Sequence, residues 1–102
     1  MNYQTFSPST DLSAFVKCYW TLQGTDGVGE KQTIVPDGHI ELIFHKGDHY
    51  RQYLPNGDII LQPKCFVIGQ LTQPLEIAAT GQTNIIAVRF QHFGFDPFSK
   101  IP

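Results

Sequence analysis

Apolar and polar residues alternate along much of the chain, which is the pattern of β-strands in a sheet. The clearest example is a predicted strand over residues 40–45. One face of this strand carries Ile40, Leu42 and Phe44, and the other carries His39, Glu41, Ile43 and His45. The first face is fully apolar and is predicted to face the core. The second face is mixed, so it is predicted to line a pocket or to form the exposed side of a sheet.

Turn-forming residues divide the rest of the chain into further short strands. Pro36 and Gly38 predict a turn before the strand just described, because proline restricts φ and glycine accepts a positive φ. Asn56-Gly57 predicts a hairpin between strands 50–54 and 59–61. Gly81-Gln82 predicts a second hairpin between strands 75–80 and 84–90. The remaining predicted strands cover residues 19–22, 32–35 and 65–71.

Only the N-terminal region departs from this strand pattern. Residues 1–8 are predicted to form an irregular arm, and residues 10–18 a short helix that begins at Ser9 or Thr10. This helix is predicted because Leu12, Phe15, Val16 and Tyr19 repeat at helical spacing. We therefore expect a mainly β fold, with one N-terminal helix and roughly seven to eight short antiparallel strands in a sandwich or small barrel. Periodicity alone does not separate these two architectures.

Composition limits the classes of function that this chain serves. Its 102 residues are enough for one domain, and 41% hydrophobic content supports a packed core. The net charge is −2 and the seven basic residues are scattered, so the chain is not expected to bind nucleic acid by itself. The sequence contains no signal peptide and no apolar run of about 20 residues, so no membrane partner is expected. Cys18 and Cys65 are expected to be reduced thiols, which fits a cytoplasmic location.

Four polar residues on or near the central strand are candidates for metal binding: His39, Glu41, His45 and His49. Histidine and carboxylate side chains are common ligands of transition metals. However, Glu41 and His45 would lie roughly 13 Å apart along an extended strand, too far for one ion. We therefore expect solvated or hydrogen-bonded histidines, and no metal or other cofactor.

Glu41 and Arg89 are the most informative charges, since each lies within an apolar strand. Paired with each other, they would form either a structural tie or the polar anchor of a small-molecule site. The aromatic residues Tyr19, Trp20, Tyr50 and Tyr53 would line a site for a sugar or an aromatic ligand, or else pack in the core. The candidate ligand-binding residues are Glu41, Arg89, His39, Tyr19, Trp20 and Tyr50.

The sequence shows no nucleophile elbow, phosphate loop or close cysteine pair, so enzymatic activity is not expected. His92 is predicted to lie in a turn. Phe93, Phe95 and Phe98 are predicted to form a surface on which a following part of the protein docks.

Four segments, in this order, resemble the N-terminal sensor domain of AraC-family bacterial transcription regulators. They are residues 12–20 with Tyr19-Trp20, the strand after Pro36-Asp37-Gly38, residues 67–71, and residues 86–90 followed by Phe93-Gly94-Phe95. The resemblance implies a cupin-like fold that binds a small effector or a partner subunit. It also implies that residues 1–102 are one N-terminal domain. DNA would then be bound only by a helix-turn-helix domain beyond Pro102.

Three functions follow as hypotheses. In the first, the chain is the effector-sensing or dimerisation domain of an AraC-type regulator, and an effector shifts the population between two arrangements of the sensor. In the second, it is a small cupin-like metal-dependent enzyme that uses His39, Glu41 and His45. In the third, it is a ligand-free interaction module with an apolar patch at residues 93–98. The sequence leaves open whether the chain forms a homodimer.

Overall fold

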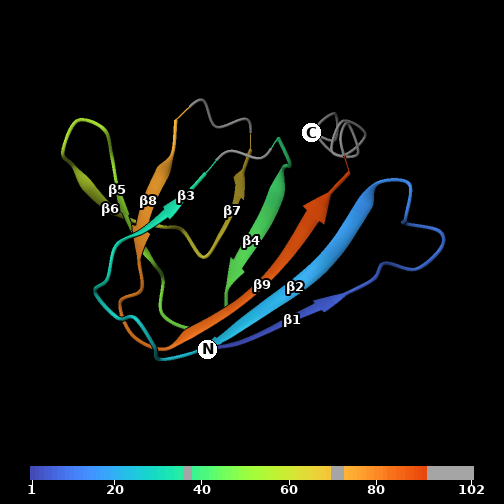
Figure 1. Cartoon of the computed structure of the whole chain (residues 1–102), viewed down its shortest axis with the longest axis horizontal. Coiled ribbons are helices and arrows are strands. Elements are labelled where there is room, and N and C mark those ends of the chain that lie inside the picture. Colours follow the sequence, from blue (N-terminus) through green and yellow to red (C-terminus); the bar gives the residue numbers. More distant parts are fainter. Residues whose placement is uncertain (36–37, 70–72, 92–102) are drawn as a thin grey trace.

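The chain forms two antiparallel β-sheets, and the expected mainly β fold is confirmed (Figure 1). The computed structural model describes residues 1–35, 38–69 and 73–91. The large sheet has the order β1-β2-β9-β4-β7, with β1 Asn2–Phe6, β2 Val16–Gly24, β9 Thr83–Phe90, β4 Glu41–His45 and β7 Cys65–Ile68. The small sheet has the order β3-β8-β5-β6, with β3 Gln32–Ile34, β8 Leu75–Ala78, β5 Arg51–Tyr53 and β6 Ile59–Leu61.

The hydrophobic core lies between the two sheets. Its buried residues come from both of them and from the adjoining loops: Ile43, Tyr50, Ile77, Ala79, Ile85 and Ala87. Strands β1 and β7 are the edges of the large sheet, and β3 and β6 are the edges of the small sheet. The described strands therefore form open sheets and do not close into a barrel.

The two faces of β4 are the reverse of the sequence prediction. Ile43 is only 4% exposed and lies opposite Ala87 of β9, whereas Phe44 is 38% exposed. The mixed face that carries Glu41, Ile43 and His45 is therefore the inner one. The prediction that Ile40, Leu42 and Phe44 form the core face was wrong. Both faces of this strand are rich in apolar residues, so alternation alone does not identify the face that the second sheet covers.

The predicted hairpin between residues 75–80 and 84–90 is also wrong. Strand β8 pairs with β3 and β5 in the small sheet, whereas β9 pairs with β2 and β4 in the large sheet. The chain crosses from one sheet to the other through residues 79–82, where the Gln82 N–H donates to Asp48 Oδ2 at 2.7 Å. By contrast, the hairpin between β5 and β6 is confirmed, and Gly57 in its turn has φ +93°.

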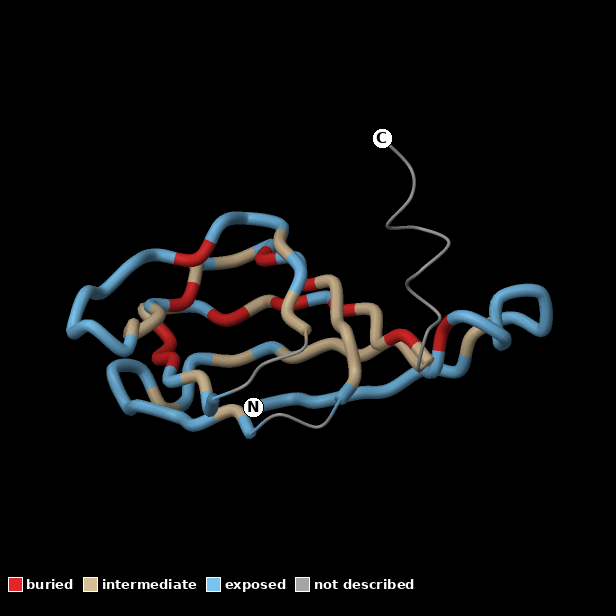
Figure 2. Tube along the Cα trace, turned by 90° about the horizontal axis from the view of Figure 1, so that it is seen from above, coloured by how far each residue is buried: buried red, intermediate tan, exposed pale blue. Residues whose placement is uncertain are grey.

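The N-terminal region contains a strand and turns, and the expected helix is absent from the described residues. β1 pairs with β2 from Asn2 opposite Gln23 to Phe6 opposite Tyr19, so the predicted irregular arm was wrong. Residues 10–15 form turns, and Figure 2 shows them in the exposed loop that projects from one end of the molecule. From Val16 onward the backbone pairs with β9, which satisfies its hydrogen bonds without a helix.

Several sequence predictions lie outside the described residues. These are the turn at Pro36-Asp37, the strand end at Gln70 and Leu71, His92, and the aromatic group Phe93, Phe95 and Phe98. Within the described part of the chain, no helix has the length and hydropathy needed to cross a membrane.

Candidate functional site

Three of the predicted site residues meet on the inner face of the large sheet. Glu41 at the start of β4 lies directly opposite Arg89 near the end of β9, and Arg89 Nε donates to Glu41 Oε1 at 2.5 Å. The indole N–H of Trp20 in β2 donates to the same oxygen at 3.3 Å. The predicted pairing of Glu41 with Arg89 is therefore confirmed, with Trp20 as a further donor. We call these three residues the carboxylate cluster.

The carboxylate cluster is partly open to solvent. The side chains of Glu41 and Arg89 are 16% and 30% exposed. The Trp20 and Arg89 hydrogen bonds both go to the same carboxylate oxygen, Oε1. The Tyr3 ring lies 5.9 Å from the Trp20 ring and tilted by 42°. The cluster thus combines an ion pair, two donors directed at one carboxylate oxygen, and aromatic surface.

The other predicted site residues are placed elsewhere. Tyr19 lies opposite Val88, one position out of phase with Trp20, and so belongs to the outer face of the large sheet. Tyr50 is buried in the core, where its hydroxyl lies 3.0 Å from Thr83 Oγ1. His39 precedes β4, and its Nε2 accepts from Lys17 Nζ at 3.5 Å. These contacts do not join Tyr19, Tyr50 or His39 to the Glu41 carboxylate.

A second polar group, which the sequence did not indicate, is buried around His45. His45 is 2% exposed, and its Nε2 lies 2.9 Å from the side-chain oxygen of Gln62. An amide oxygen only accepts, so Nε2 carries the proton and Nδ1 is left as an acceptor. That Nδ1 is buried without a hydrogen-bond partner among the described residues. The group could not be read from the sequence, because Gln62 lies beside Pro63 in a stretch that resembles a turn.

Burial determines the charge state of His45. The rings of His49, Tyr50 and Phe66 stack against it at centroid distances of 5.4, 5.5 and 5.7 Å. Burial lowers the pKa of His45 below its ordinary value of 6.5. The hydrogen bond that Nε2 donates to Gln62 opposes this shift, and neighbouring His49 lowers the pKa further. His45 is therefore neutral at neutral pH.

The described residues include no group of three histidine, cysteine or acidic side chains placed to hold a metal ion. Of the four candidates named from the sequence, His45 and His49 stack as rings 5.4 Å apart. Glu41 instead bonds to Arg89. These three side chains therefore take part in hydrogen bonds and ring contacts.

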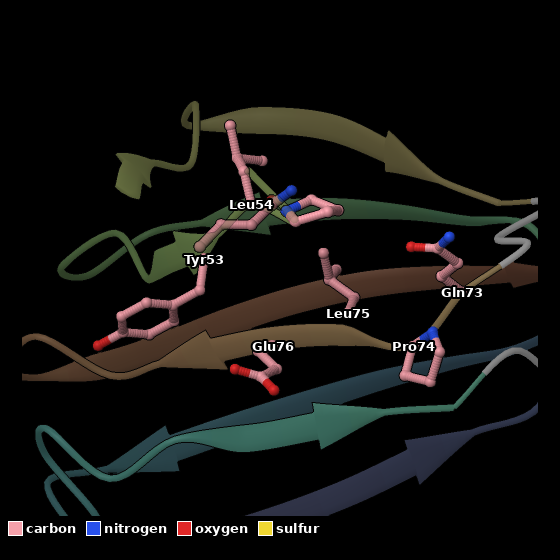
Figure 3. Close-up of a pocket in the computed structure, with 8 residues that line it drawn as sticks. Tyr53, Leu54, Gln73, Pro74, Leu75 and Glu76 are labelled. Atoms are coloured by element: carbon pink, nitrogen blue, oxygen red, sulfur yellow. The ribbon is translucent and has the colours of Figure 1, made fainter. Parts of the chain in front are cut away.

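An open groove of about 670 Å³ lies where β5 ends and β8 begins (Figure 3). It is lined by Gln52, Tyr53, Leu54, Pro55, Gln73, Pro74, Leu75 and Glu76. The Nζ atom of Lys31 lies 4.3 Å from the centre of the Tyr53 ring and 3.9 Å from Glu76 Oε2. In Figure 1, the end of β5 and the start of β8 lie on the same side of the molecule as the start of β4 and the end of β9, where the carboxylate cluster lies. Of the four aromatic residues named from the sequence, Tyr53 alone is among the residues that line this groove.

We expect Glu41 and Arg89 to be energetically coupled. Arg89→Met should destabilise the chain by about 1–2 kcal/mol, because it leaves a partly buried carboxylate without its cation. In a chain that already carries Glu41→Gln, Arg89→Met should cost less, because no carboxylate is left without a cation. The difference between the two costs is the coupling energy of the pair, about 0.5–2 kcal/mol after solvent screening. Urea unfolding of the wild type, both single variants and the double variant measures the coupling. Additive effects would show that the pair contributes nothing beyond its separate side chains.

Comparison with known proteins gives one family. The family model described as a domain of unknown function (DUF6597) matches residues 4–102. No curated protein matches the chain with significant similarity.

Proposed function

The chain belongs to the DUF6597 family, and from its site we propose that it is the effector-sensing domain of an AraC-type transcription regulator. In this proposal the domain binds a small molecule in the cytoplasm, and its two sheets are a cupin-like variant of the sandwich. A separate helix-turn-helix domain binds the DNA. Effector binding shifts the population between two arrangements of the sensor, and that shift repositions the DNA-binding domain.

One observation carries the proposal, namely the carboxylate cluster on the inner face of the large sheet. Interior faces of sheets are normally apolar, and a charged pair there is retained at a cost in desolvation. Arg89 and Trp20 hold one oxygen of Glu41 in place. In this proposal the second oxygen, Oε2, accepts a hydrogen bond from the ligand. Small-molecule sites have this composition, in which a few fixed polar groups lie among apolar and aromatic surface.

The chemistry of the cluster favours a neutral ligand. Glu41 and Arg89 carry opposite charges and form an ion pair, so the pair itself has no net charge. A charged ligand would be repelled by one of the two side chains. Hydroxyl groups donate well to a carboxylate oxygen, and sugar or aromatic rings stack on an indole. The ligand class is therefore a sugar or a small hydroxylated aromatic compound.

A thermal-shift titration tests the proposal. We expect one or more of the simple aldoses or hydroxybenzyl alcohols to raise the melting temperature saturably, by several degrees at about 100 times Kd. Glu41→Gln and Trp20→Phe should each abolish the shift, since each removes a group that contacts the ligand. Ile86→Thr, on the outer face of β9, is the matched control and should leave the shift unchanged.

A saturable shift in melting temperature that persists in Glu41→Gln would show that the ligand binds at another site. No shift with any compound of either class would contradict the sensing role. It would favour the ligand-free interaction module, for which the exposed Phe44, Val67 and Ile86 on the outer face of the large sheet are the specific observation.

The division of labour with a DNA-binding domain has its own test. With a net charge of −2 and scattered basic residues, the 102-residue chain should give no specific complex in a gel-shift assay. In the gene, the reading frame after the Pro102 codon should encode two helix-turn-helix motifs with a basic balance. Tight specific DNA binding by the chain alone would contradict the proposal.

A further inference from the structure

Strand β6 is an edge strand made entirely of exposed apolar residues. Among the described strands, β6 pairs only with β5. Ile59, Ile60 and Leu61 are 56%, 42% and 62% exposed. Natural edge strands usually carry a charge, a proline or a bulge that prevents further pairing. Within its three residues β6 has none of these, so its outer edge is available to another strand.

The hydrogen bonds at the two ends of β6 show which backbone groups face outward. The Gln62 N–H donates to the Tyr50 carbonyl at 2.9 Å, and the Asp58 carbonyl accepts from the Leu54 N–H at 2.8 Å. Backbone groups in a strand point alternately to the two sides. Ile60 therefore points toward β5, as Asp58 and Gln62 do. The N–H and C=O groups of Ile59 and Leu61 point away from the sheet.

These outward groups are complementary to themselves. If a second β6 lies antiparallel, with the two Ile60 residues facing each other, Ile59 of each copy lies opposite Leu61 of the other. Each such pair exchanges two hydrogen bonds, so every outward N–H and C=O of Ile59 and Leu61 gains a partner. The apolar side chains of the same residues pack across the new ladder.

Charge at the ends of β6 favours the same arrangement. Asp58 precedes the strand and Lys64 follows it. Antiparallel pairing brings the acidic end of one strand to the basic end of the other, whereas parallel pairing would place like charges together. Pro63 has no N–H and so limits the ladder on that side. Both features favour a short antiparallel ladder, and a second copy of β6 supplies the complementary charges.

We propose that β6 is a homodimerisation edge, at which two copies of this chain pair their β6 strands antiparallel about Ile60. The two small sheets then form one continuous sheet across the two-fold axis. Because the ladder is short and buries less than a standard interface, the dimer is weak, with a Kd on the order of 100 µM. This inference is independent of ligand binding and goes beyond the sensing role.

Analytical ultracentrifugation of the 102-residue chain, from about 5 µM to about 500 µM, tests the proposal. The wild type should change from monomer to dimer across this range. Ile59→Lys/Leu61→Lys places like charges opposite each other and should weaken the dimer at least about tenfold. Ile59→Lys/Leu61→Glu places opposite charges face to face in this register and should keep the Kd within about threefold of the wild type.

The charge-swapped variant makes the test specific for register, because a ladder centred on Leu61 would set the two introduced glutamates against each other. Val67→Lys, an exposed position on edge strand β7 of the large sheet, is the matched control and should dimerise like the wild type. Circular dichroism checks that each variant is folded. The proposal is overturned by a wild type that stays monomeric at about 500 µM. A dimer that tolerates the double lysine variant, or one that Val67→Lys abolishes, overturns it equally.

Discussion

Ile43→Ala should destabilise the folded chain by about 2–5 kcal/mol, the usual range for a buried isoleucine. Ile43 is 4% exposed and lies in the middle of β4 between β7 and β9, opposite Phe66 and Ala87. Truncation leaves a cavity between the two sheets, which the surrounding strands cannot fill. A loss of this size is a large part of the roughly 5–15 kcal/mol that stabilises a domain. Urea unfolding followed by circular dichroism measures it.

Phe44→Ala is the matched control for this prediction. Phe44 is the next residue of the same strand and is 38% exposed on the outer face. Its truncation should cost about 1 kcal/mol or less, because the side chain already contacts water. If Phe44→Ala were the more damaging change, the core would lie on the opposite face of β4, as the sequence pattern alone predicted.

Lowering the pH below 6.5, the ordinary pKa of histidine, should destabilise the chain through His45. Burial lowers the pKa of His45 in the folded state, so the unfolded chain binds a proton at a higher pH than the folded chain does. The stability contributed by neutral His45 is complete above pH 6.5 and declines as the pH falls toward the lowered pKa. The slope is at most about 1.4 kcal/mol per pH unit for one group.

The free energy of unfolding, measured at intervals from pH about 7.5 to about 5, isolates this contribution by comparison with His45→Gln. Glutamine keeps a donor for Gln62 Oε1 but does not titrate. The variant should therefore lose less stability than the wild type as the pH falls, even if it is less stable at neutral pH. Equal pH dependence in the two proteins would show that the pKa of His45 is the same in the folded and the unfolded chain, which contradicts the prediction.

Local signals in the sequence were sufficient for most strands and for one hairpin. The β5–β6 hairpin follows from Asn56-Gly57, because a tight reversal needs a residue that accepts positive φ and Gly57 does so. The strand at residues 59–61 was predicted with the bounds that the structure shows. The pairing of Glu41 with Arg89 was also predicted, since a charge inside an apolar strand needs a partner.

Signals that depend on distant parts of the chain were missed. Gly81-Gln82 has the composition of a hairpin turn, yet β8 and β9 belong to different sheets because other strands satisfy their edges. The helical spacing of Leu12 and Phe15 is likewise overruled, since the backbone from Val16 onward pairs with β9. The contact of His45 with Gln62 spans 17 positions and has no local pattern.

The sequence by itself determined that this is a β-rich chain and where most strands lie, and it named Arg89 as the candidate partner of Glu41. Only the tertiary structure decided which face of β4 is inside, which sheet each strand joins, and that Trp20 completes the carboxylate cluster while Tyr19 does not. The physical reason is that alternation specifies two faces but not which of them a second sheet covers. That choice depends on the total burial and hydrogen bonding of the whole chain.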